Sequence, residues 1–356
     1  MAAAGAVSSR TMSSSEPAGI RTTEVSGWLT GNVPGAKAPF TFDAVAGGRS
    51  NLTYIVTDAE QRRFVLRRPP LGHLLPSAHD MAREYRIISG LHRSEVPVPT
   101  PLGFCSNESV SDRPFYVMSF VDGLVLRSPA EGERLPVSAR SHASESIADT
   151  LLALHRVDLD AVGLADLGKR EGYIERQLRR WHSQFTDSKT REIPLVDDLQ
   201  RRLIARVPPQ QASTIVHGDY RLDNTIVGAD GSVLAVLDWE ICTLGDPLAD
   251  LGLLLVYWPD SGDANPPLGA AASQLPGFWS SAQLRARYAS GTKLDVSDLD
   301  FYVAFAYWKL ACILEGVYAR YVQGAITGDG YDHTVLRAQV PLLAEAADAA
   351  LATLGA

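Results

Sequence analysis

The sequence predicts an α+β protein with a strand-rich N-terminal region and a mostly helical remainder. Up to Asp122, short apolar or alternating stretches are separated by turn residues, which is typical of an antiparallel sheet. After Gly123, apolar residues recur at helical spacing over longer stretches. Within this helical part, only the stretch from Ile215 to Glu240 returns to a strand pattern.

Five antiparallel strands are predicted in the N-terminal region: Thr41–Ala46, Leu52–Val56, Arg62–Arg67, Leu102–Cys105 and Phe115–Val121. The first bend is a glycine turn that contains Gly47, Gly48, Arg49 and Ser50. Glycines let the backbone pass close to a ligand, and the exposed N–H groups of such a turn can bind phosphate oxygens. A Gly-Gly pair in a hairpin is nevertheless most often only a turn.

One helix is predicted between the third and fourth strands, from Ala78 to Leu91. Ser77 is a suitable N-cap, and Asp80 is its capping-box partner. Glu84 lies on this helix, and taken alone it is best explained as a charge on a solvated face. Ile20–Gly31 is predicted to form either a short helix or a cap.

Three segments follow from these patterns: a disordered tail at residues 1–19, an N-terminal lobe at 20–121 and a helical C-terminal lobe at 122–356. The predicted helices of the last segment are Ser141–Val157, Tyr173–Phe185, Leu195–Val207, Leu248–Trp258, Ala282–Tyr288, Asp298–Gln323 and Asp332–Leu354. Residues 259–277 are rich in Pro, Gly and Ala, and we expect a mobile insertion there. Whether they close over a substrate is open.

The stretch from Ile215 to Glu240 predicts a hairpin with strands Thr225–Val227 and Val233–Leu237. Because a hairpin brings its two ends together, Asp219, Asn224 and Asp238 should converge. Two carboxylates and an amide oxygen make a site suited to Mg²⁺ and phosphate. The alternative is a turn rich in capping residues, since Asn and Asp favour turns.

The composition indicates which binding partners and which cellular compartment suit the protein. The net charge of −8 and the lack of a long basic stripe argue against nucleic acid. Leu248–Trp258, the longest dense apolar run, is too short to span a membrane. The three cysteines are widely spaced and the first residues lack a signal-peptide pattern, which favours a reducing, cytoplasmic setting. Monomer and homodimer are both open.

The segment from His217 to Asn224, H-G-D-Y-R-L-D-N, resembles the catalytic loop of the aminoglycoside phosphotransferase/choline kinase-like family, within the bilobal protein-kinase-like fold. Asp238-Trp239-Glu240 is similar to the family's metal-binding segment. Leu237–Leu251 and Val65–Pro70 further resemble the phosphotransferase domain of acyl-CoA dehydrogenase fusions.

The resemblance implies ATP and Mg²⁺ as cofactors and assigns roles. Asp219 would be the catalytic base, and Asn224 and Asp238 would hold the metal. His217 would brace the loop. Nucleotide contacts would come from Gly47, Gly48, Arg49, Ser50, Arg67 with its partner Glu84, and the backbone near Ser119 and Val121.

The sequence departs from the kinase pattern at several points, and these limit which class of kinase it can encode. Arg67 stands where kinases carry a lysine, and arginine is not a simple substitute. The glycine turn is shorter than G-x-G-x-x-G. Asp238 is not followed by D-F-G or A-P-E segments, which argues against a protein kinase.

The resulting prediction is a small-molecule kinase that phosphorylates a hydroxyl group, with a hydroxyacyl-CoA or related hydroxy compound as the preferred acceptor. Aminoglycosides are polycations, and the mixed charges Lys309, Glu315 and Arg320 of the late helix do not suit them. The alternatives are an aminoglycoside phosphotransferase, a nucleotide-binding pseudokinase scaffold and, less favoured, a metal-dependent hydrolase.

Overall fold

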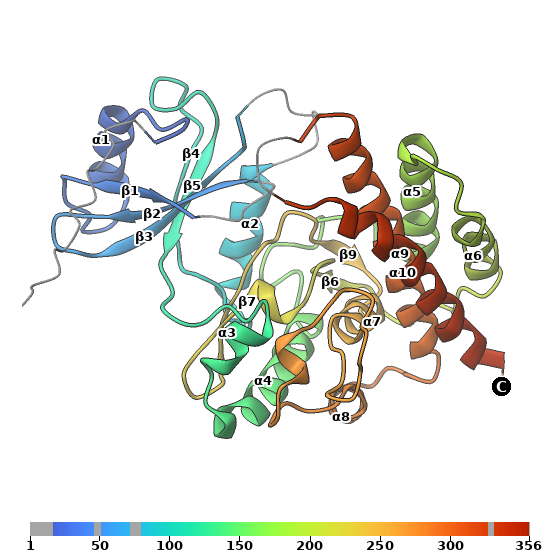
Figure 1. The fold of residues 1–356 in the computed structure, drawn as a ribbon. Helices are drawn as coiled ribbons and strands as arrows, with labels where there is room; N and C mark the ends of the chain where they lie inside the picture. Colours follow the sequence, from blue (N-terminus) through green and yellow to red (C-terminus); the bar gives the residue numbers. More distant parts are fainter. Residues whose placement is uncertain (1–16, 46–50, 72–79, 327–330, 356) are drawn as a thin grey trace, which may run out of the picture. The chain divides into compact units, whose positions relative to one another are not determined.

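The computed structural model describes residues 17–45, 51–71, 80–326 and 331–355 (Figure 1). The chain divides into two compact units, one comprising Met1–Tyr85 and Thr100–Phe120 and the other Arg86–Pro99 and Val121–Ala356. Most of the predicted tail, the glycine turn with Gly47, Gly48, Arg49 and Ser50, and the predicted N-cap Ser77 lie outside the described residues.

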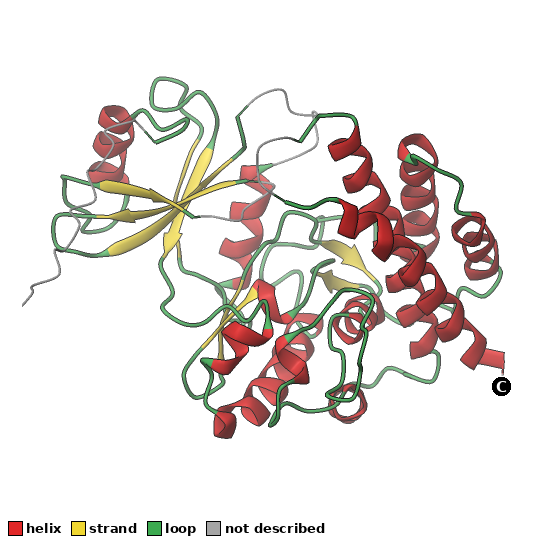
Figure 2. Ribbon diagram, viewed as in Figure 1, coloured by secondary structure: helices red, strands yellow, loops and turns green. Residues whose placement is uncertain are grey.

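The first unit contains the predicted five-stranded antiparallel sheet, which is confirmed with the strand order β1-β2-β3-β5-β4 (Figures 1 and 2). Its strands are β1 (Thr41–Ala44), β2 (Leu52–Thr57), β3 (Arg63–Arg68), β4 (Pro101–Cys105) and β5 (Phe115–Ser119). β3 and β5 are neighbours although a helix and a strand separate them in the sequence.

Helix α1 (Thr22–Asn32) covers one face of this sheet and completes its core. Val25 and Leu29 are fully buried there, and the Trp28 ring meets the edge of Phe115 at 5.0 Å between ring centroids. Because strand side chains alternate, Leu66 faces this core whereas Arg67 faces the other way. Arg67 meets Glu84 of helix α2 (Met81–Leu91), so the start of α2 lies over the opposite face.

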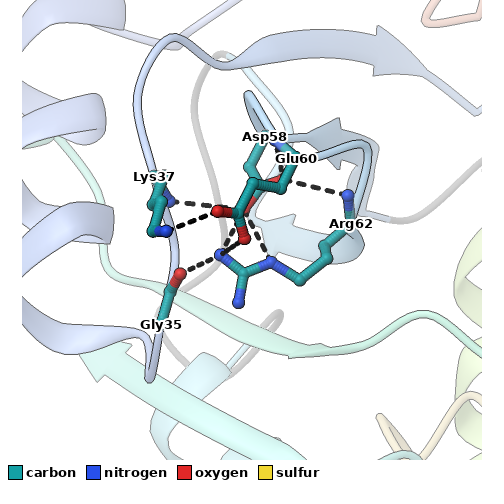
Figure 3. Close-up of polar contacts among 5 residues, drawn as sticks. All are labelled: Gly35, Lys37, Asp58, Glu60 and Arg62. Carbon is teal, nitrogen blue, oxygen red and sulfur yellow. Dashed lines mark hydrogen bonds and ion pairs between the residues drawn. The ribbon is translucent and has the colours of Figure 1, made fainter.

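The turn between β2 and β3 is held by a charged cluster around Asp58 (Figure 3). The Asp58 carboxylate is buried and accepts hydrogen bonds from the backbone N–H groups of Glu60 and Arg62 at 2.8 and 2.9 Å. The Arg62 guanidinium binds the other carboxylate oxygen, with Nη2 at 2.7 Å. Lys37 adds its backbone N–H, and its ammonium pairs with Glu60. The aspartate thereby fixes the turn.

The second unit is mainly helical and is organised around α9 (Leu299–Val322). This helix packs against α5, α6, α7 and α10, and Trp308 in its middle donates to the Val196 carbonyl at 3.0 Å. The other helices are α3 (Pro129–Glu133), α4 (Val137–His155), α5 (Tyr173–Ser188), α6 (Pro194–Ile204), α7 (Leu248–Val256), α8 (Ser281–Gly291) and α10 (Thr334–Ala352).

Two features of the second unit were not predicted. The strands β6 (Thr214–Val216) and β9 (Thr243–Gly245) form a small antiparallel sheet. Three-residue strands are too short to show an alternating pattern. Helix α3 was also missed. In the described part of the chain, no helix has the length and apolarity that crossing a membrane requires.

Candidate active site

The predicted hairpin is present and closes at its base. Its strands are β7 (Thr225–Val227) and β8 (Val233–Val236), paired antiparallel. Just beyond β8, the Leu237 N–H donates to the Asn224 carbonyl at 2.8 Å. This bond places the residue before Asp238 directly beside Asn224, at the end of the catalytic loop. Asp238 itself has a positive φ of 66°, a conformation that side-chain-bearing residues adopt rarely.

Asp219 and Asn224 are in direct contact. The Asn224 side chain donates to the Asp219 carboxylate oxygen Oδ2 at 2.7 Å and to the Asp219 backbone carbonyl at 2.8 Å. Both partners are acceptors, so the amide nitrogen of Asn224 faces them and its oxygen Oδ1 points the other way. That oxygen is the atom that a hard cation could bind.

His217 braces the loop from inside. The imidazole is fully buried, accepts the Asp219 N–H at Nδ1 (3.2 Å) and contacts the Leu237 carbonyl through Nε2 at 2.8 Å. Because Nδ1 accepts, Nε2 carries the hydrogen and donates to Leu237. The Trp239 ring packs on it at 4.6 Å. One side chain therefore joins the segment of Asp219 to the segment of Asp238.

Asp250, on α7, holds the loop from beneath. Its carboxylate accepts the backbone N–H groups of His217 at 2.6 Å and Gly218 at 2.8 Å, and it is only 1% exposed. His155 approaches it at 3.5 Å and bonds the Tyr288 hydroxyl at 2.7 Å. Burial would raise the pKa of Asp250, but the contacts with His155 and the Gly218 N–H keep it below its usual value.

Asp250 was not singled out from the sequence. A carboxylate inside a buried helix is itself a signal, because an unpaired buried charge is very costly. Lys309 and Glu315 were considered only as two of the mixed charges of the late helix. Both are buried: Lys309 donates to the Gly218 carbonyl at 2.9 Å, and Glu315 accepts from Thr190.

Arg221 is a second residue that the sequence did not single out. Its Nε contacts Asp219 Oδ2 at 3.3 Å, its Nη1 contacts Asp223 at 2.8 Å, and its guanidinium lies 4.7 Å from the Tyr257 ring centroid. Burial opposes its charge, but the neighbouring carboxylates raise the pKa of Arg221, so it stays a cation. Burial raises the pKa of Asp223 despite this arginine.

The donor set fits a hard divalent cation. Asp238 offers a carboxylate and Asn224 an amide oxygen, and Mg²⁺ in phosphoryl-transfer sites binds one or two such groups together with substrate phosphates. In the described ranges, no three His, Cys, Asp or Glu side chains form a metal site by themselves.

In the first unit, Arg67 and Glu84 form a buried pair. Arg67 Nε lies 3.2 Å from Glu84 Oε2, and the same carboxylate accepts from Asn51 at 3.1 Å and from the Tyr116 hydroxyl at 3.0 Å. Glu84 is 2% exposed, so the interpretation as a solvated charge was wrong. Its four-residue network holds the Arg67 side chain in place. A role in nucleotide binding stays a prediction for both residues.

The other predicted nucleotide contacts are only partly described. Ser119 ends β5, where its N–H donates to the Thr100 carbonyl and its hydroxyl accepts the Thr100 N–H, each at 2.9 Å. The Ser119 N–H is therefore engaged within the sheet unit. Val121 begins the last segment of the other unit. Adenine binding at this segment stays a prediction.

Residues 41–288 match the model of the phosphotransferase enzyme family, and the chain belongs to that family.

Two curated relatives contain the matched region as part of a longer protein. The chain is 38% identical over 281 residues to acyl-CoA dehydrogenase family member 10 of Mus musculus, which covers 78% of the chain and 26% of the relative. It is 36% identical over 287 residues to acyl-CoA dehydrogenase family member 11 of Gallus gallus, covering 78% and 36%. The chain thus spans well under half the length of these relatives.

Solved structures confirm the protein-kinase-like fold. A candidate aminoglycoside phosphotransferase from Ralstonia eutropha is 32% identical with a TM-score of 0.77, covering 93% of this chain and 98% of that one. Choline kinase from Cryptosporidium parvum has a TM-score of 0.65 at 11% identity, covering 94% and 97%. At that identity, the second likeness shows the fold alone.

Proposed function

We propose that the protein is an ATP- and Mg²⁺-dependent kinase that transfers the γ-phosphate to a hydroxyl group of a small molecule. The observation that carries this proposal is the one-sided occupation of the Asp219 carboxylate. Among the described residues, its two side-chain donors, from Arg221 and Asn224, both contact Oδ2. Oδ1 is therefore the atom that can accept the proton of an acceptor hydroxyl, as a general base must.

The remaining residues would position the nucleotide and neutralise the charge of its phosphates. Asn224 Oδ1 and the Asp238 carboxylate would hold Mg²⁺, which when bound neutralises charge on the nucleotide phosphates. Arg67, fixed by Glu84, would contact phosphate oxygens as a rigid planar donor. The backbone of the glycine turn would cover the phosphates. Because phosphoryl transfer needs little covalent help, such positioning accounts for most of the catalysis.

The acceptor is inferred from the second unit. A pocket of about 110 Å³ adjoins the catalytic loop at Arg221, and a larger one of about 520 Å³ shares Val256, Pro259 and Pro266 with it. The larger pocket is lined mostly by apolar side chains. The charged lining of the two pockets balances, with three arginines and three aspartates: Arg127, Arg221, Arg285, Asp223, Asp263 and Asp300.

A site for a polycation would carry an excess of carboxylates, which these pockets lack. Lys309 and Glu315 do not line either pocket. An acceptor with an apolar body and little positive charge suits the pockets better. The relatives named as acyl-CoA dehydrogenases favour a hydroxyacyl-CoA or a related hydroxy compound. The competing class is the aminoglycosides, which the name of the Ralstonia eutropha protein raises.

The test is ADP release from ATP in the presence of Mg²⁺, measured over a panel of hydroxyacyl-CoAs, free hydroxy acids and aminoglycosides. We expect acceptor-dependent ADP release with the first two classes and phosphorylated product by mass spectrometry. Turnover with aminoglycosides alone would reverse the acceptor assignment and leave the kinase assignment intact.

The matched pair of variants for this assay is Asp219→Asn and Asp230→Asn. Asp230 lies exposed in the hairpin turn, so the same chemical change there removes no group of the catalytic loop. Asp219→Asn should give the background rate, and Asp230→Asn the wild-type rate. Equal product formation by wild type and Asp219→Asn with every acceptor would favour the pseudokinase scaffold.

A further inference from the structure

Lys309 is buried against the catalytic loop. All five lysines of the chain fall within the described residues, and Lys309 is the only buried one, at 6% exposure. Its ammonium donates to the backbone carbonyl of Gly218 at 2.9 Å and lies 5.7 Å from the Trp181 ring centroid. The direct hydrogen-bond partner is therefore a neutral carbonyl next to Asp219.

Burying this ammonium is costly. Burial lowers the pKa of Lys309 and so works against its charged form, while the nearby charges of Asp219 and Asp250 support it and Arg180 opposes it. A well-packed apolar side chain would often stabilise such a position as well or better. Fold stability alone therefore gives little reason for a lysine here.

The Gly218–Asp219 peptide is the group that Lys309 holds. Lys309 binds the oxygen of this peptide, and His217 Nδ1 accepts its N–H. Asp250 accepts the N–H of the preceding peptide, that of Gly218. Both ends of the peptide that leads into Asp219 are thus bonded to buried side chains, and Lys309 is the sole side-chain donor to its oxygen among the described residues.

Gly218 is the point where this peptide could turn over. Its φ is +85°, in the left-handed region that glycine enters without steric cost. Glycine also allows the peptide that follows to rotate with little penalty. Such a rotation would swing the Gly218 carbonyl away from Lys309 and change the direction in which the Asp219 carboxylate points. The ammonium opposes it by holding the oxygen.

We propose that Lys309 is a positioning residue for phosphoryl transfer, whose ammonium locks the Gly218–Asp219 peptide so that the Asp219 carboxylate faces the acceptor hydroxyl. The proposal rests on the proposed function for its effect on rate, and on the backbone contacts for its effect on the loop. A displacement of about 1 Å in a catalytic group can cost roughly 10²-fold in rate.

The experiment compares wild type with Lys309→Met, which keeps the length of the side chain and removes the donor and the charge. We expect kcat about 10²-fold lower with KM for ATP changed no more than about twofold, because the lost contact aims the base and binds no nucleotide. Hydrogen exchange at the Asp219 amide should become at least ~10-fold faster, since the peptide is freed to rotate.

The matched control is Glu315→Gln, which alters another buried charge on α9. Glu315 binds Thr190 and Arg191 and does not contact the catalytic loop. This variant should unfold more easily but keep the wild-type kcat and the wild-type exchange at Asp219. Lys309→Gln, measured in parallel, keeps a neutral donor and should show smaller effects in the same direction as Lys309→Met.

The two readouts separate this proposal from the proposed function. If wild type phosphorylates no acceptor, the proposed function fails, while exchange at the Asp219 amide still decides whether Lys309 holds the peptide. Unchanged exchange and unchanged kcat in Lys309→Met would overturn the positioning role. If Lys309→Met does not fold, the decision falls to Lys309→Gln. Wild-type protection of the Asp219 amide in that variant would also overturn the positioning role.

Discussion

Two aspartates of this chain are each paired with an arginine a few residues later, and the two pairs differ in what they leave available. Asp58 in the β2–β3 turn accepts five hydrogen bonds, from three backbone N–H groups and two guanidinium nitrogens of Arg62 (Figure 3). Both of its oxygens are occupied. Asp219 accepts its two side-chain donors on one oxygen only, among the described residues.

Under the proposed function, the same residue types serve structure in one place and chemistry in another. At Asp58, the donors come from its own turn, so the carboxylate is consumed in holding that turn. At Asp219, the loop is held by other groups: His217, Asp250 and Lys309 bind its backbone. Because those residues supply the support, the Asp219 carboxylate keeps one oxygen for the proposed acceptor hydroxyl.

The largest expected effect is that of replacing Asp219, which tests whether its carboxylate accepts the proton of the acceptor hydroxyl. In Asp219→Asn, the side chain can no longer accept a proton, so kcat should fall by about 10²–10⁴-fold. The folded structure should persist, since His217, Asp250 and Lys309 hold the loop through its backbone. The measurement is steady-state ADP release together with a thermal unfolding scan. A variant with more than about a tenth of wild-type kcat would contradict the assignment of Asp219 as the base.

The next effect concerns Arg221, which contacts the carboxylates of Asp219 and Asp223. In Arg221→Gln, the contact with Asp219 Oδ2 is lost and Asp223 loses its cationic partner, so we expect kcat roughly 10-fold lower. Arg201→Gln is the matched control, because Arg201 forms only an exposed pair with Asp198. Equal kcat values for the two variants would show that Arg221 has no part in aiming Asp219.

Much of this comparison was visible in the sequence, and part of it was not. The five strands and the β7–β8 hairpin were predicted because alternation and turn residues are local signals. The resemblance of His217–Asn224 to a known catalytic loop pointed to Asp219 without any structure. Tertiary contacts are different: the contact of Lys309 with Gly218 was not predicted, because an apolar helix does not reveal which neighbour each of its polar residues meets.

Glu84 and Asp250 show the same limit. The sequence around Glu84 suggests a solvated helix face. Only the packing of α2 on the sheet reveals that Arg67, Asn51 and Tyr116 surround its carboxylate. Asp250 stands in an apolar stretch, and its partners lie more than thirty residues earlier, at His217 and Gly218. Sequence patterns of short range cannot pair such residues, because the pairing depends on how the elements pack.

A smaller effect is expected at Asp58, and it should appear in stability and not in rate. In Asp58→Asn, one oxygen becomes an NH₂ group that faces the donors of Lys37 or Arg62, so hydrogen bonds are lost and donors oppose each other. The melting temperature should fall by several degrees, while kcat of the folded enzyme stays at the wild-type value. A lower kcat at unchanged melting temperature would mean that the two aspartates are not divided between structure and chemistry.

The smallest expected effect is the pH dependence of the difference in stability between wild type and Asp58→Asn. Burial raises the pKa of Asp58, but the backbone N–H groups of Arg62, Glu60 and Lys37 and the Arg62 charge lower it more, so it lies below its ordinary value. A carboxyl with a depressed folded-state pKa stabilises the fold above its unfolded pKa of about 3.9, and this contribution is lost as pH falls through the folded-state value. The gap in unfolding free energy between wild type and Asp58→Asn should therefore be constant from pH 7 to about 5 and shrink below about pH 4. Urea titrations of both proteins across this range measure it, and other acidic groups cancel in the difference. A gap that widens on acidification would show that the Asp58 carboxylate is not the group that holds the turn.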